Sequence, residues 1–285
     1  MSTPTAPQQQ DSRREELATL ILLATRALGT AWQDLAAAQT TLLKTLSTRR
    51  ARRRRTGSIP PDVRKALREF TTATARFDRA AAALITRWAA VDLPRAYRAG
   101  AEDALRTAVL RAGQARTTFT WTAEHQNTIT ALSAAYYATL MHRIQDAVRR
   151  AQAFQRAVTA AARQPGTPDT TALAAQHDLG TVRYAGDRRH PVEAWAHSAL
   201  AAQAGTTASI AAVRAALDMG AQWMQITDGP ECGWVSHPDP DHADGTLRSV
   251  EEAGAYPIAH PGCIRRMTPR PDLTGRTDIE EGQAA

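Results

Sequence analysis

The sequence is poor in the residues that build disulfide frameworks, thick sheets and membrane spans. Of its 285 residues two are cysteine and 5% are aromatic, and lysine stands only at Lys44 and Lys65. Two cysteines in a chain of this size argue against a disulfide framework. The longest apolar stretch, residues 17–28, contains Arg26 and is shorter than the ~18 residues that a membrane span needs. The N-terminus is polar and lacks the pattern of a secretory signal, so we expect synthesis in the cytosol.

Alanine and arginine are abundant instead. The net charge is +7 and the pI is near 10.1, which favours an anionic partner such as nucleic acid. A skew toward alanine and arginine is also what a GC-rich genome produces, so composition alone leaves both interpretations open.

Apolar residues recur at helical spacing along most of the chain. A capping-box pattern, Ser12 followed by Glu15, predicts the start of a first helix. Residues 61–91 keep a four-three apolar alternation that predicts a long second helix antiparallel to the first. We expect Pro94 to interrupt the chain before a shorter helix that ends near Gly113. Further helices are predicted at residues 120–163, 170–178 and 192–219.

The remaining residues alternate as strands do. Residues 221–227, 245–250 and 263–269 are strand candidates, and residues 250–256 predict a short helix. The predicted fold is mainly α, with long antiparallel helices followed by a small C-terminal α/β module that has a short antiparallel sheet. The expected organisation is a disordered tail (residues 1–11), a helical body (12–165), the C-terminal module (180–272) and a second disordered tail (273–285).

A dense basic run follows the first helix. Six arginines occupy seven positions: Arg49, Arg50, Arg52, Arg53, Arg54 and Arg55. The run predicts contact with phosphates of nucleic acid or with an acidic protein surface, and the alternative is a solvated helix end. No helix-turn-helix, zinc finger or aromatic stacking motif accompanies it, so sequence-specific DNA binding is not indicated.

Both cysteines lie in residues 228–263, together with three of the eight histidines and five prolines. Cys232, His237, His260 and Cys263 form a Cys-x4-His and His-x2-Cys arrangement, which supplies the four donors of a tetrahedral zinc site. His242, Asp239 and Asp241 are substitute ligands. Reduced cysteines packed in a small core, or a transient thiol link, are the alternatives.

Other chemistry is weakly indicated. Residues 239–245 lack the acidic ligands that a calcium loop needs at its fifth and twelfth positions. Ser236 and His237 point to opposite faces of an extended chain, so they do not form a nucleophile–base pair. The five histidines outside this region stand singly and are expected on helix surfaces or at interfaces. They are His125, His142, His177, His190 and His197.

Residues 181–272, about a third of the chain, resemble the MuF-like phage head morphogenesis proteins, also called minor capsid proteins. "VRYAGDRR" (182–189), "DGPECGW" (228–234), Asp244–Gly245 and "AHPGCIRR" (259–266) carry the resemblance. Family members have a second cysteine in each of the two cysteine segments, where this chain has Val235 and Arg265. Only Cys232, His260 and Cys263 match the family's cysteine and histidine positions.

The resemblance implies a non-enzymatic virion component of a tailed phage. Such a protein is made in the host cytoplasm and assembled into the head near the portal. The implied partners are the portal protein, the major capsid protein and packaged DNA, with no membrane span and no small-molecule substrate. No cofactor is predicted apart from zinc at the cysteine and histidine site. A capsid maturation protease, or another hydrolase of the head, and a nucleic-acid-binding module acting through the arginine run are the alternatives.

Overall fold

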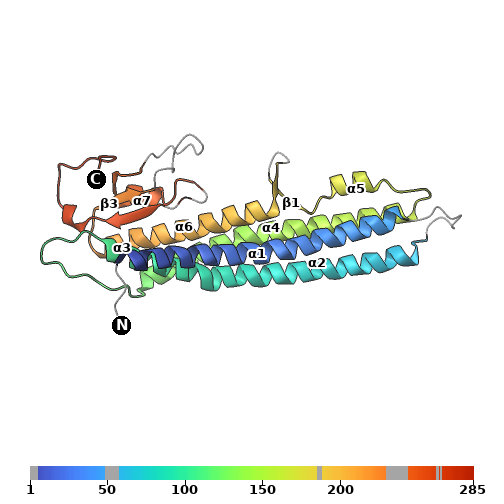
Figure 1. The fold of residues 1–285 in the computed structure, drawn as a ribbon, viewed down its shortest axis with the longest axis horizontal. Helices are drawn as coiled ribbons and strands as arrows, with labels where there is room; N and C mark the ends of the chain where they lie inside the picture. The colour runs from blue at the N-terminus through green and yellow to red at the C-terminus, as the bar shows by residue number, and fades with distance from the viewer. Residues whose placement is uncertain (1–5, 49–57, 185–187, 229–242, 261–262, 264) are drawn as a thin grey trace. The chain divides into compact units, whose positions relative to one another are not determined.

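The computed structural model describes residues 6–48, 58–184, 188–228, 243–260, 263 and 265–285. In the described chain helices dominate and the strands are short (Figure 1). The helices are α1 (Ala6–Ser47), α2 (Pro61–Arg87), a π-helical turn (Trp88–Asp92), α3 (Leu93–Thr107), α4 (Ala123–Arg163), α5 (Thr170–Gln176), α6 (Val192–Asp218), α7 (Val250–Ala255) and the 3-10 turn η3 (Pro271–Leu273). The strands are β1 (Thr181–Arg183), β2 (Arg189–Pro191), β3 (Trp223–Thr227), β4 (Leu247–Ser249) and β5 (Arg266–Pro269). The predicted mainly α fold with a small antiparallel sheet is confirmed.

The chain divides into two units, and neither is continuous in sequence. One unit contains residues 1–23, 88–136 and 197–285, and the other contains residues 24–87 and 137–196. The sequence predicted a helical body and a C-terminal module that followed one another, whereas α1, α4 and α6 each contribute residues to both units. Among the described helices none combines the length and the apolar character that a bilayer crossing requires.

The unit of residues 24–87 and 137–196 is built on α1, α2 and α4. Leucines of α1 recur on one buried stripe, namely Leu28, Leu35, Leu42 and Leu46. Trp32 packs edge-on against Phe77 at a centroid distance of 5.0 Å, and Phe70 meets Phe154 at 5.2 Å. Interlocking rings on three helices add large apolar side chains to the core of this alanine-rich bundle.

Polar side chains hold the segment after α5 on this bundle. Trp32 Nε1 donates to the Leu179 carbonyl (2.7 Å), and Gln39 Nε2 donates to the His177 carbonyl (2.6 Å). Arg150 donates to the carbonyls of Asp178 and Thr181 at 2.6 and 3.0 Å. These bonds satisfy main-chain groups before β1 and at its first residue, and β1 pairs antiparallel with β2.

The π-helical turn corrects the predicted register of the second helix. Val63, Leu67, Phe70, Thr74, Phe77 and Ala81 are buried as the alternation predicts. The buried stripe is already displaced by one residue before the turn, because Ile85 is buried where Leu84 was expected. The turn adds a residue to the helical repeat, and beyond it Val91 is 47% exposed while Asp92 is only 6% exposed. The chain also does not break at Pro94, because proline is accepted in the first turn of α3.

In the other unit, α3 and α6 lie next to a three-stranded sheet. The strand order is β4-β3-β5, and both pairings are antiparallel. Trp88 Nε1 donates to Gln203 Oε1 (2.9 Å), and Arg266 on β5 donates to Asp103 on α3 (3.0 Å). Gly100 touches α6 so closely that a Cβ there would lie 2.2 Å from the Ala208 carbonyl oxygen.

Both ends of the described chain differ from the expected tails. Residues 6–11 belong to α1, so the helix begins before the predicted cap at Ser12. Residues 282–285 pair with β4, through a bridge between Thr246 and Ala284 and the bond from Leu247 N–H to the Gln283 carbonyl (2.7 Å). Periodicity cannot detect such pairing, because it uses main-chain groups rather than apolar side chains.

Candidate functional site

Asp228 and Arg265, from residues 228–234 and 259–266, meet where β3 ends and β5 begins. Asp228 follows β3 directly and Arg265 precedes β5 directly, and the register pairs Thr227 with Arg266. Antiparallel pairing therefore brings both side chains to the same end of the sheet. Arg265 Nε donates to Asp228 Oδ1 at 2.7 Å and Nη2 donates to Oδ2 at 2.6 Å, with each side chain 1% exposed. This is a buried, bidentate ion pair.

Three further segments join this pair. Arg265 Nη1 donates to the Tyr256 carbonyl (2.7 Å), and Asp244 Oδ1 accepts from the Asp228 main-chain N–H (2.7 Å). The Cys263 sulfur lies 4.0 Å from Asp228 Oδ1. We refer to Asp228, Asp244, Tyr256, Cys263 and Arg265 as the Asp228 network. The paired charges are buried, and both partners make further hydrogen bonds. The network therefore holds the segment after β3 and the segment before β5 in a fixed position relative to each other.

Of the four proposed zinc ligands, only His260 and Cys263 lie within the described residues. Cys232 and His237 lie outside the described residues, as do His242, Asp239 and Asp241. Cys263 is 8% exposed, His260 is half-buried, and the Cys263 N–H donates to the His260 carbonyl (2.9 Å). Within the described residues no three His, Cys, Asp or Glu side chains form a group that could hold a metal ion.

The residues next to Cys263 do not fit a zinc centre well. The carboxylate nearest its sulfur already binds the Arg265 guanidinium through both oxygens. A metal ion at that sulfur would stand beside a fixed positive charge, which opposes cation binding. The Cys2His2 site stays a prediction.

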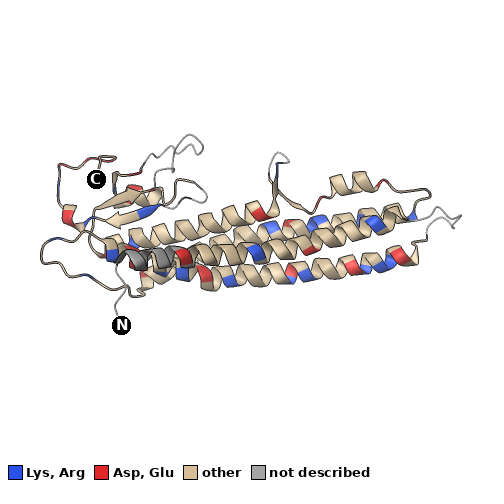
Figure 2. Ribbon diagram, viewed as in Figure 1, with Lys and Arg blue, Asp and Glu red and all other residues tan. Residues whose placement is uncertain are grey.

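The arginine run also lies outside the described residues: Arg49, Arg50, Arg52, Arg53, Arg54 and Arg55 all fall within residues 49–57. The described helix that follows carries charge of both signs (Figure 2). On α2 Lys65 lies 3.8 Å from Glu69, and both side chains are exposed. A continuous basic stripe is therefore not a property of α2, and phosphate contact through the run stays a prediction.

His125 is a buried histidine that joins several helices. It was expected to stand singly on a helix surface or at an interface, and it is 2% exposed. Its Nδ1 lies 2.8 Å from the Tyr97 hydroxyl and its Nε2 lies 2.9 Å from Asp218 Oδ2. The three residues join α3, α4 and α6. Burial raises the pKa of Tyr97 to about 12, and the negative charge of Asp218 adds to that shift.

No signal in the sequence marked these three residues as a group. Tyr97 and His125 are 28 residues apart, His125 and Asp218 are 93 residues apart, and neither separation belongs to a known motif. Phe119 and Trp121 pack edge-on against the imidazole. Both ring nitrogens are engaged and the tyrosine is fully buried, so the arrangement fastens three helices rather than presenting a base to a substrate.

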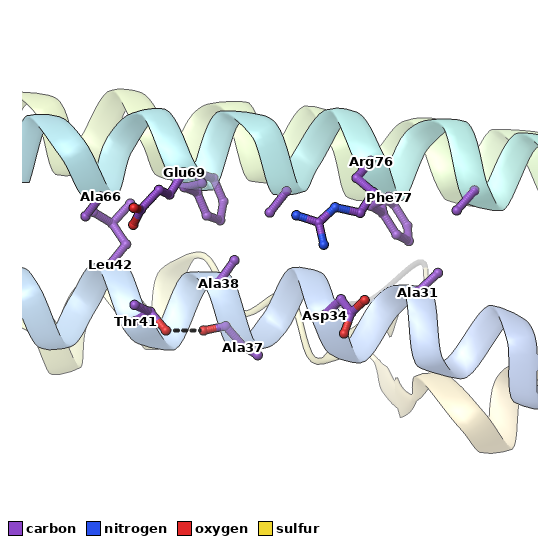
Figure 3. A pocket seen from close by; sticks show the side chains of 13 residues that line it. Ala31, Asp34, Ala37, Ala38, Thr41, Leu42, Ala66, Glu69, Arg76 and Phe77 are labelled. Carbon is purple, nitrogen blue, oxygen red and sulfur yellow. Dashed lines mark hydrogen bonds between the residues drawn. The ribbon is translucent and has the colours of Figure 1, made fainter.

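A groove lies between α1 and α2. Its volume is about 310 Å³, and six of its thirteen lining residues are alanines. Figure 3 shows Leu42 beside Ala66 at one end and Ala31 with Phe77 at the other, as the antiparallel arrangement requires. Asp34, Glu69 and Arg76 are the charged lining residues. They are spread along the groove rather than converging on one point, which does not suit a catalytic centre.

Comparisons with protein-family models, with curated proteins and with solved structures find no match for this chain.

Proposed function

We propose that the protein is a structural, non-enzymatic minor capsid protein of the MuF-like head morphogenesis type from a tailed phage. In this proposal it is made in the host cytoplasm and assembled into the head, where it binds portal or coat subunits near the portal. It acts in DNA packaging or ejection through these contacts.

One observation supports a structural role most strongly, and it is the Asp228 network. The residues that carry the resemblance, Asp228 in "DGPECGW" and Arg265 in "AHPGCIRR", make a buried ion pair with each other. Both carboxylate oxygens accept from the guanidinium, so neither is presented to a substrate. A pair of this kind holds loops in register and is poorly suited to proton transfer.

A functional test uses the phage that encodes the chain. Deleting the gene is expected to abolish plaque formation, and the wild-type gene supplied in trans is expected to restore it. Asp228→Asn supplied in trans should restore it poorly, because the buried guanidinium loses its counter-charge. Full plaque formation without the gene would contradict the proposal.

The hydrolase alternative has a separate test. Purified protein is incubated with the coat protein of the same phage, and the products are resolved by mass spectrometry. We expect no cleavage at defined sites. Specific cleavage that His237→Ala abolishes would overturn the non-enzymatic assignment.

A further inference from the structure

The outer edge of β4 is occupied by the last residues of the sequence. Leu247 N–H donates to the Gln283 carbonyl (2.7 Å), and Gly282 N–H donates to the Leu247 carbonyl (2.9 Å). Ala285 N–H donates to the Gly245 carbonyl (3.0 Å). The Glu281 carboxylate accepts from Ser249 N–H, with both oxygens at 3.1 Å. Residues 281–285, which we call the strap, therefore lie along the outer edge of β4 and form one β-bridge there, between Thr246 and Ala284.

The strap is held by main-chain hydrogen bonds and by the Glu281 carboxylate. Every one of its five residues is exposed, and none has a large apolar side chain. Gly282 takes a φ of 77°, a conformation that favours glycine, and the Gln283 N–H donates to the Glu280 carbonyl (3.2 Å) in the turn that precedes the pairing. Hydrogen bonds that exchange for bonds to water contribute little net stability, so the strap detaches far more easily than the sheet unfolds.

The edge beneath the strap is firmly anchored. The Leu247 side chain is 4% exposed, and Ile226 N–H donates to the Thr246 carbonyl (2.9 Å) across the β3–β4 pair. Asp244, at the start of this segment, belongs to the Asp228 network. When the strap leaves, β4 stays in place and presents a row of main-chain donors and acceptors, which is the template for strand addition.

We propose that the outer edge of β4 is a docking site for an extended segment of a partner protein, and that the strap occupies this site in competition. The strap defines the segment that fits. A carboxylate one residue before the paired stretch accepts from Ser249 N–H in a charge-assisted bond, and the residues after it have no large apolar side chain. The partner segment is therefore extended, with an acidic residue followed by residues that lack large apolar side chains. This inference does not rest on a role in phage heads.

The first test uses the intact protein. Amide hydrogen exchange is measured at Leu247, which pairs with the strap, and at Ile226, which pairs across the sheet. We expect Leu247 to exchange at least about 100-fold faster than Ile226, because opening the strap leaves the sheet folded. Equal protection of the two amides would show that the strap is a fixed part of the sheet and would overturn the proposal.

The second test measures docking with a probe of known sequence. A fluorescent peptide with the sequence of residues 277–285, TDIEEGQAA, is titrated into the full chain and into a chain that ends at Glu280. Binding to the shortened chain is expected to be at least about tenfold tighter, since the competing strap is gone. Peptides with Gly282→Pro, which lacks the donor to Leu247, or Glu281→Gln should bind more weakly. A shortened chain that self-associates and binds no peptide would show that the strap only protects an edge, which contradicts the proposal.

Discussion

Arg265 forms a buried ion pair with Asp228. Removing one partner of such a pair leaves the other charged and without its counter-charge in the interior, which is more costly than the pair itself is favourable. Replacing one residue of the pair should therefore destabilise the protein far more than replacing both with apolar residues.

We therefore predict that Arg265→Met lowers the free energy of unfolding by about 3 to 5 kcal/mol. Asp228→Asn is expected to be similarly destabilising, and the double variant Asp228→Leu with Arg265→Met should recover most of the loss. Urea unfolding of the four proteins checks this as a double-mutant cycle. Additive losses in the double variant would show that the two side chains do not act as a pair.

Two glycines in helices are expected to respond in opposite directions to alanine. At Gly100 a Cβ would lie 2.2 Å from a main-chain oxygen of α6, whereas at Gly29 nothing lies within 4 Å of it. Gly100→Ala should cost about 1 to 3 kcal/mol by overpacking, and Gly29→Ala should gain about 0.5 to 1 kcal/mol by helix propensity. Thermal unfolding of the two variants compares them directly. A neutral Gly100→Ala would mean that α3 and α6 do not approach so closely.

At the scale of elements, apolar spacing was sufficient to predict the long helices and the three strands of the sheet. Apolar spacing missed the features that do not depend on a periodic placement of apolar side chains. Beyond the π-helical turn Val91 lies outside the core and Asp92 within it, and the strap pairs without apolar residues. The Asp228 network was equally hidden, because a buried arginine and a surface arginine look alike in sequence. No pattern in the sequence indicated that residues 228 and 265 would pair.

Tyr97, His125 and Asp218 join three helices, and their contribution to the free energy of unfolding depends on pH in the alkaline range. Burial raises the pKa of Tyr97 from 10.0 to about 12, so the unfolded chain loses this proton before the folded chain does. The stability that the neutral phenol contributes is complete below pH 10 and is lost as the pH rises from 10 to 12.

We predict that this loss reaches about 2 to 3 kcal/mol in the wild type and is absent in Tyr97→Phe. Urea midpoints at pH 9 and at pH 11.5 measure it. Tyr137→Phe, which changes an exposed tyrosine, is the matched control and should retain the wild-type loss. The same pH response in Tyr97→Phe would assign the effect to other groups.

At the scale of the whole molecule, the net charge of +7 comes from arginine rather than lysine, and its densest run lies at residues 49–55. We predict that the affinity for duplex DNA falls steeply with salt, since each phosphate contact releases counterions. Changing the six arginines of the run to glutamine should lower the slope of log K against log salt by up to about 5. Filter binding in graded salt measures this slope.

Arg64, Arg68 and Arg79, which are exposed on α2, give a control set of glutamine substitutions that should leave the slope nearly unchanged. Affinity that ignores salt, or survives neutralising the run, would exclude phosphate contact there.

The measurement that tests the proposed function most directly is the protein composition of mature particles. Phage particles are purified through a density gradient, and peptides of this chain and of the portal and coat proteins are quantified by mass spectrometry against labelled standards. We predict that the chain is present in every preparation, in few copies per particle relative to coat protein. Particles that are infectious and contain none of it would contradict the assignment as a minor capsid protein.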